Sequence, residues 1–150
     1  MKVFTLSNVD KDKYLKNDND IEDRNLKFSW NEPANCITIA NHKNSGNIYI
    51  IYGIKLNLYG KIDSVDVFMG KDDCRICSNR ESIFNLDYIL KEDMDEFLQI
   101  GNILADEDES FDILKSDVDI VLPGGCLIIK LNENVSSLEI DMKFQKYFIG

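Results

Sequence analysis

The stretch that decides the fold is "NIYIIYGIKLNLYGK", residues 47–61. Between residues 48 and 58 an apolar side chain recurs at every second position, which is the period of a β-strand. The opposite face of this stretch carries Tyr49 and Ile51, so the strand is expected to be well buried. Gly53 stands in the middle of the pattern and predicts a bend. The side chains expected to share one face are Ile48, Ile50, Tyr52, Ile54, Leu56 and Leu58.

Short strands are predicted on both sides of this long one. "CITIA", residues 36–40, precedes it, and the polar run "NHKNSG", residues 41–46, separates the two. A run of turn residues between two apolar segments is typical of a β-hairpin. Downstream, a turn at residues 60–64 leads into "VDVFM", residues 65–69.

A second hairpin is predicted over "VDIVLPGGCLIIKL", residues 118–131. Its centre, Pro123-Gly124-Gly125, has strong turn chemistry, because proline restricts φ and glycine permits positive φ. After another polar turn, "SLEIDMKFQ", residues 137–145, alternates apolar with polar side chains. That alternation predicts a strand with one solvated face.

One helix is predicted from residue 78 onward. Ser78 and Glu81 match the capping box that satisfies backbone N–H groups at a helix start. Because "IFNLDYIL", residues 83–90, also alternates, a second interpretation starts the helix later, near Lys91. The apolar side chains at helical spacing are Ile83, Leu86, Leu90, Met94 and Phe97.

These elements predict an α+β fold in which one principal helix packs on a face of a mainly antiparallel sheet. The sheet is expected to have about six to eight strands connected by hairpins. The 150 residues are expected to form one domain, 1–150, with the polar residues 8–25 as a mobile loop. The side chains expected to be buried together are Ile50, Ile54, Leu56, Phe97, Ile120, Ile128, Ile140 and Met142.

The expected location is the cytoplasm. The first residues, "MKVFTLSNVDKDK", show neither the apolar core nor the cleavage site of a signal peptide. The apolar run "IYIIYGI", residues 48–54, is far shorter than the roughly 18 residues that a membrane span needs. The many Ile and Lys residues are typical of the AT-rich genomes of some bacteria and viruses, so the choice of Lys over Arg is not evidence for a function.

Cys74 and Cys77 form a C-x-x-C pair. A structural zinc site usually needs a second close pair of ligands, and the remaining candidates, Cys36, His42 and Cys126, form none. A redox pair is disfavoured by the adjacent acidic residues and by the antiparallel surroundings. The favoured interpretation is therefore that both cysteines are small residues in a connection between a strand and the helix, with no metal or redox role. No phosphate-binding or dinucleotide-binding glycine motif occurs, so no cofactor is expected.

Charge is the strongest functional signal. Residues 87–119 hold 12 acidic side chains and only two basic ones, Lys91 and Lys115, and their net charge of −10 equals that of the whole chain. Such a block repels phosphates, which argues against nucleic-acid binding. It suits a basic protein partner, because opposite charge steers association. The carboxylates expected to make this contact are Glu92, Asp95, Glu96, Asp106, Glu107, Asp108, Glu109 and Asp112.

The leading hypothesis is a non-enzymatic inhibitor, or immunity protein, that neutralises a cationic toxin such as a nuclease. One alternative is a small cytoplasmic or phage-encoded enzyme or redox protein that uses Cys74, Cys77 or Cys126. Another alternative is an acidic structural or regulatory subunit. A solvated acidic face without a binding role also fits the same pattern.

Overall fold

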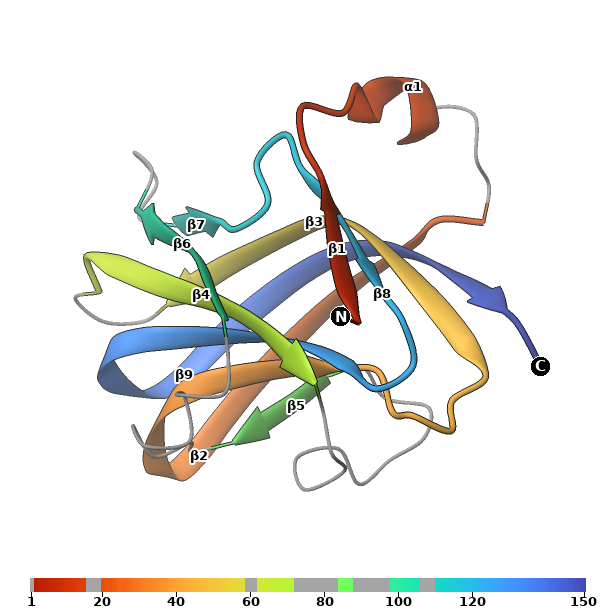
Figure 1. Cartoon of the computed structure of the whole chain (residues 1–150). Helices are drawn as coiled ribbons and strands as arrows, with labels where there is room; N and C mark the ends of the chain where they lie inside the picture. Colours follow the sequence, from red (N-terminus) through yellow and green to blue (C-terminus); the bar gives the residue numbers. More distant parts are fainter. Residues whose placement is uncertain (1, 16–19, 59–61, 72–83, 88–97, 106–109) are drawn as a thin grey trace.

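The computed structural model describes residues 2–15, 20–58, 62–71, 84–87, 98–105 and 110–150. This part of the chain is almost entirely antiparallel sheet, curled into a half-barrel (Figure 1). The elements are β1 (Val3–Leu6), α1 (Lys11–Leu15), β2 (Glu22–Ala40), β3 (Asn47–Leu58), β4 (Ser64–Lys71), β5 (Phe84–Asp87), β6 (Leu98–Leu104), β7 (Ser110–Asp112), β8 (Val118–Val121) and β9 (Gly125–Phe148). The antiparallel sheet is confirmed. The predicted α+β class is wrong, because the one helix in these residues, α1, is five residues long.

The predicted principal helix is contradicted at its centre. Strand β5 lies there and pairs antiparallel with β2, with Leu86 opposite Ile37. Over the described residues 84–87 the alternation therefore indicates the structure, and the helical spacing does not. The physical reason is that the edge of β2 has N–H and C=O groups that need a partner strand. The rest of the predicted helix, residues 78–83 and 88–97, lies outside the described residues.

The long strand β9 organises the sheet. It pairs with β2 along both of its halves, with β4 over residues 125–131 and with β3 over residues 138–148. Two half-sheets therefore share the β2–β9 pair, and the bend of that pair curls one half over the other (Figure 1). The space between the halves holds the main core.

The two predicted hairpins are not formed by the strands expected to make them. Strand β9 lies between β2 and β3, and β8 pairs with β1 and β3 instead of β9. The predicted turns themselves exist: Gly124 has a positive φ of 87°, and Gly125 N donates to Leu122 O at 2.9 Å. Each turn connects strands that do not pair with each other. The strand before each turn pairs with distant strands: β2 pairs with β9, and β8 pairs with β1 and β3.

Asn41, which is almost fully buried, ties these two connections together. Its backbone N–H donates to Gly125 O at 2.9 Å, and its carbonyl accepts from Gly124 N at 2.7 Å. Its side-chain Nδ2 donates to Asn47 O at 2.8 Å and Val121 O at 3.0 Å. Since Ser45 Oγ also donates to Oδ1 at 2.6 Å, every polar group of this buried amide has a partner.

The bend predicted at Gly53 is a β-bulge. The register of β3 against β9 shifts between Ile51 and Gly53. An extra residue reverses the face to which later side chains point. Tyr49 and Ile51 therefore share the buried face with Ile54 and Leu56, whereas the period-two prediction had continued the even-numbered face through the bulge.

The predicted core is partly confirmed. Ile54, Leu56, Ile140 and Met142 belong to the main core between the halves. Ile128 is buried in a second, smaller cluster with Cys36, Ala40 and Cys126. Ile50 and Ile120 are only half-buried, because they point away from the core face of β3 and β8, and Phe97 lies outside the described residues.

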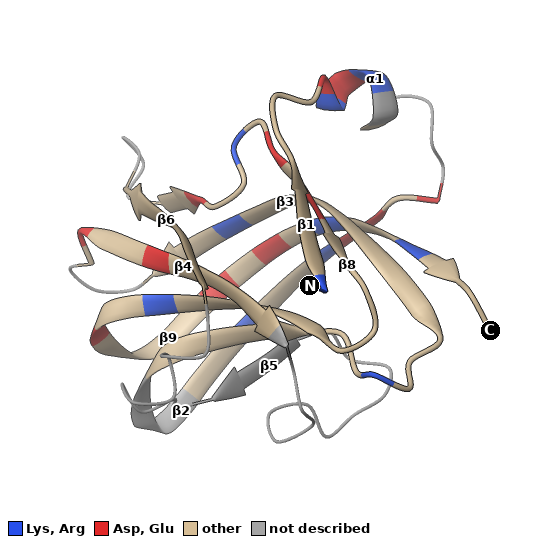
Figure 2. Ribbon diagram, in the orientation of Figure 1, with Lys and Arg blue, Asp and Glu red and all other residues tan. Residues whose placement is uncertain are grey.

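The outer face of the β3–β9–β2 half is polar. Opposite charges face each other across its strands: Asp141 pairs with Lys55, and Glu139 pairs with Lys27. Figure 2 shows Lys and Arg interspersed with Asp and Glu along these strands. Such cross-strand pairs stabilise a solvated sheet face modestly. The single wet face predicted for residues 137–145 is confirmed for Glu139, Asp141 and Lys143, whereas Gln145 at its end is buried.

Part of the predicted mobile loop, residues 8–25, lies in regular secondary structure. Helix α1 occupies residues 11–15, and β2 begins at Glu22, which pairs with Phe144. Residues 16–19 of this segment lie outside the described residues, and its mobility stays a prediction. In the part of the chain that the structure describes, no helix is long and apolar enough to cross a membrane.

Candidate functional site

Asp119 is a carboxylate on the core face of the half-barrel. It sits in β8 between Thr5 of β1 and Ile51 of β3, its two register partners. Cross-strand partners share a face of the sheet, and Ile51 is fully buried in the main core. Asp119 itself is only 1% exposed. An acidic side chain at such a position is rare unless it is paired.

The two oxygens of this carboxylate differ. Oδ1 accepts a 2.7 Å hydrogen bond from Thr5 Oγ1, whereas the buried Oδ2 accepts none from the described residues. Burying a polar atom without a partner is unfavourable. A buried polar atom without a partner therefore calls for an explanation, and a bound ligand that donates to it is one.

Burial raises the pKa of Asp119 to about 6. The neighbouring carboxylate of Asp117 raises this pKa further, while the Thr5 hydrogen bond and the Lys11 ammonium lower it. Desolvation is the largest of these effects. A strongly shifted carboxyl in a hollow marks a candidate functional site.

A cavity of about 440 Å³ lies beside this carboxylate. It is formed by β1, β4, β6, β8 and the connection between β7 and β8. This volume is in the range of small-ligand sites. Its apolar wall comprises Val67, Met69, Ile100, Ile103, Ile113 and Leu114. Its polar residues include Thr5, Ser7, Asp117 and Asp119.

Helix α1 is anchored beside the cavity by Lys11. The Nζ of Lys11 donates a short hydrogen bond to the carbonyl of Lys115. Just before the helix, the backbone N–H of Val9 donates to Ser116 O at 2.9 Å. Partial burial lowers the pKa of Lys11, while three carboxylates act in the opposite direction. The ammonium group of Lys11 therefore interacts electrostatically with these carboxylates. Those carboxylates are Asp112, Asp117 and Asp119.

Exposed apolar side chains lie on the strands that border the cavity. Among the described strands, β1 pairs only with β8, and β6 pairs only with β4, so each has an unpaired edge. Large exposed apolar residues on unpaired edges are typical of surfaces that another chain covers. On β1 they are Phe4 and Leu6, and on β6 they are Leu98, Ile100 and Leu104.

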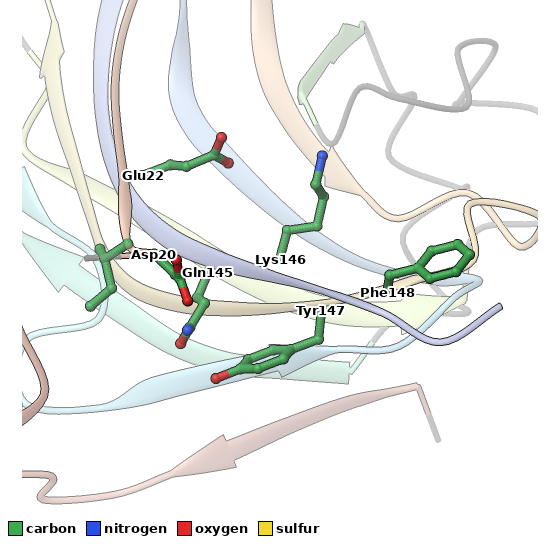
Figure 3. A pocket seen from close by; sticks show the side chains of 7 residues that line it. Asp20, Glu22, Gln145, Lys146, Tyr147 and Phe148 are labelled. Carbon is green, nitrogen blue, oxygen red and sulfur yellow. The ribbon is translucent and has the colours of Figure 1, made fainter. Parts of the chain in front are cut away.

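A second depression, of about 450 Å³, lies at the end of β9 against the start of β2. Figure 3 shows Gln145 and Tyr147 on one side of β9 and Lys146 on the other, so its polar groups do not converge. Gln145 is held by Tyr52, whose hydroxyl lies 3.2 Å from its Oε1. A site without converging polar groups offers little specificity, and the Asp119 cavity is therefore the better candidate.

Seven of the eight acidic residues predicted to bind a partner lie outside the described residues, as do Cys74 and Cys77. The eighth, Asp112, is exposed in β7, where its Oδ1 accepts a 3.1 Å hydrogen bond from Lys115 N. Cys126, which the enzyme or redox alternative would use, is fully buried and belongs to the second cluster. The seven outside are Glu92, Asp95, Glu96, Asp106, Glu107, Asp108 and Glu109.

From the sequence, Asp119 is one of the twelve acidic residues of segment 87–119, and its charge alone does not distinguish it from the others. A signal was present: in "VDIV" a carboxylate sits inside an otherwise apolar strand. The inward direction of its side chain depends on the pairing with β1 and β3, which the residues of β8 alone do not encode. Among the described residues there is no group of three or more side chains that could hold a metal ion.

No known family model matches this chain, and no curated protein matches it. Several solved structures resemble it weakly. The Drosophila NLP core is 13% identical, with 81% of this chain and 96% of that one covered and a TM-score of 0.36. RmlC from Streptococcus suis is 9% identical, with 94% and 56% covered and a TM-score of 0.35. A protein of Bacillus endospore appendages is 14% identical, with 87% and 89% covered and a TM-score of 0.28. Likenesses this weak assign neither family nor function.

Proposed function

We propose that this protein is a non-enzymatic, cytoplasmic binding protein that captures a basic protein partner through its acidic segment, residues 87–119. The narrower form of the proposal is an inhibitor or immunity protein whose carboxylates occupy the positive cleft of a cationic toxin such as a nuclease. The observation that carries the proposal is the concentration of the whole net charge of −10 in residues 87–119.

The described members of that segment support this assignment. Asp112 is exposed on β7, and Asp117 and Asp119 line the cavity beside it. Of the exposed apolar side chains on β1 and β6, Ile100 of β6 lines the same cavity. Interfaces commonly combine an apolar centre with charged surroundings, in which the charges increase the association rate and exclude wrong partners.

The test starts from capture of the partner from an extract at low and high salt. Binding of the captured protein is then measured for a variant in which five carboxylates of the segment become amides: Glu92→Gln, Asp95→Asn, Glu96→Gln, Asp106→Asn and Asp108→Asn. We expect the association rate to fall at least about tenfold, since steering by opposite charges contributes factors of about 10 to 10³. Salt should have less effect on the variant, because fewer charges remain to be screened.

A matched control removes five carboxylates elsewhere, on β2, on β9 and just before β2: Asp20→Asn, Glu22→Gln, Asp23→Asn, Glu133→Gln and Glu139→Gln. It changes the net charge equally, so it separates a local interface from a general effect of charge. An association rate that both variants lower equally, or that neither lowers, would refute the proposal.

A further inference from the structure

We propose that the cavity beside Asp119 is a binding site for a primary alkylammonium group, with the ammonium on Asp119 and the aliphatic stem against the apolar wall. This inference does not depend on the proposed basic protein partner. It concerns one cavity and one ligand chemistry. The ligand can be a free alkylamine or the side chain of a lysine.

The first step is the unsatisfied oxygen. Asp119 Oδ2 is buried, accepts no hydrogen bond from the described residues and belongs to a side chain that lines the cavity. A carboxylate oxygen in this position needs a donor, and a positively charged donor compensates both the missing hydrogen bond and the buried charge.

The second step is the choice of cation. Thr5 Oγ1 already donates to Oδ1 of Asp119, so Oδ2 is the oxygen that lacks a donor among the described residues. A guanidinium forms its best contacts with both oxygens of a carboxylate at once, whereas an ammonium is a compact point charge that one oxygen can hold. The carboxylate of Asp117 and the hydroxyl of Ser7 also line the cavity and can accept further ammonium protons.

The third step is the stem. Ile100, Ile103, Ile113 and Leu114 line the same cavity as Asp119. An apolar wall of this kind gains free energy by covering methylene groups. A bare ammonium or a metal ion would leave that wall in water. The combination of one carboxylate and an aliphatic wall therefore favours an amphiphilic cation.

The fold supplies a precedent in Lys11. Its ammonium group lies close enough to Asp112, Asp117 and Asp119 that each of them raises its pKa. Its hydrogen bond goes to the carbonyl of Lys115 and not to Asp119. A primary ammonium is thus already the cation that this side of the molecule accommodates, while Oδ2 is left for a second one.

The experiment titrates the full chain with pentylammonium and, separately, with 1-pentanol, and follows backbone and methyl NMR signals. We expect pentylammonium to shift signals of Ile100, Ile103 and Leu114. In Asp119→Asn its affinity should fall at least about tenfold, because a hydrogen bond to a charged group is lost. Pentanol should bind weakly and equally to both proteins. The control Asp63→Asn, at an exposed carboxylate, should bind pentylammonium as the wild type does.

The inference is overturned if pentylammonium shifts none of these signals, or if Asp119→Asn binds it as tightly as the wild type. If Asp119→Asn does not fold, the wild type decides: pentanol binding as tightly as pentylammonium would overturn the inference equally. A further titration with Nα-acetyl-lysine methylamide separates the two sources. Binding of this compound supports a lysine side chain, and binding of pentylammonium alone supports a free amine.

Discussion

Thr5 Oγ1 donates a 2.7 Å hydrogen bond to Asp119 Oδ1 across the pairing of β1 and β8. This bond links the N-terminal edge strand to a carboxylate that is otherwise unsatisfied among the described residues. The edge strand therefore contributes directly to the candidate site. It also partly offsets the effect of burial on the pKa of Asp119.

The stability of the protein should depend on the titration of Asp119. Its folded-state pKa is raised to about 6, against about 3.9 for an unfolded aspartate. Between these values the folded protein keeps a proton that the unfolded chain has released, so stability falls as the pH rises. The shift corresponds to about 3 kcal/mol, lost between about pH 4 and pH 7.

The measurement is urea unfolding of the wild type and Asp119→Asn across this range. The other carboxylates titrate in both proteins, so the difference between the two curves isolates Asp119. Parallel curves would show that this carboxyl is not buried as described. Thr5→Val should raise the pKa of Asp119 further, whereas Thr5→Ser, which keeps the hydroxyl, should not.

Gly125→Ala should destabilise the fold by displacing β1. A Cβ at this position would lie 2.5 Å from the carbonyl oxygen of Lys2, which is backbone and cannot move alone. We expect a loss of about 1–3 kcal/mol, typical of overpacking, and weaker hydrogen-exchange protection in β1. The matched control is Gly53→Ala, where no atom lies within 4 Å of the added Cβ. Equal stability of both variants would contradict the described approach of Lys2 to β9.

Asn41→Ala should be among the costly single substitutions. It removes a buried amide that bonds to Ser45, Asn47 and Val121, and it leaves two carbonyls without these donors. Each buried group left unsatisfied costs about 1–3 kcal/mol, so a total near 3 kcal/mol is expected. Asn44→Ala, in the same loop but exposed, serves as the control. Thermal or urea unfolding that finds the two variants alike would rule out the role of Asn41 as the tie between the two connections.

The bulge at Gly53 predicts that two isoleucines of β3 contribute unequally to the free energy of unfolding. Ile54→Ala should cost about 2–5 kcal/mol, because Ile54 is buried in the main core. Ile50→Ala should cost clearly less, because its side chain is only half-buried on the other face. Ile128→Ala, in the second cluster, should resemble Ile54→Ala. Similar midpoints for the Ile50 and Ile54 variants in urea would mean that the strand keeps one phase through Gly53.

The alternation of apolar and polar residues is sufficient to identify the strands at the centre of the fold. Residues 47–58 and 137–145 alternate with period two, and both are strands. The sequence also indicated the turn at Gly124, because positive φ is a local property of glycine. Local preference and local periodicity were sufficient for these features, since neighbouring residues alone produce them.

Tertiary structure alone decided which strands are partners and which side chains face the core. The pairing of β9 with β2, β3 and β4 joins residues far apart in the chain, and no local pattern distinguishes it from a hairpin. The same pairing made residues 84–87 a strand and moved the buried phase of β3 across Gly53. It also turned Asp119 inward, so the candidate site exists only because backbone hydrogen bonding between distant strands fixed the direction of one carboxylate.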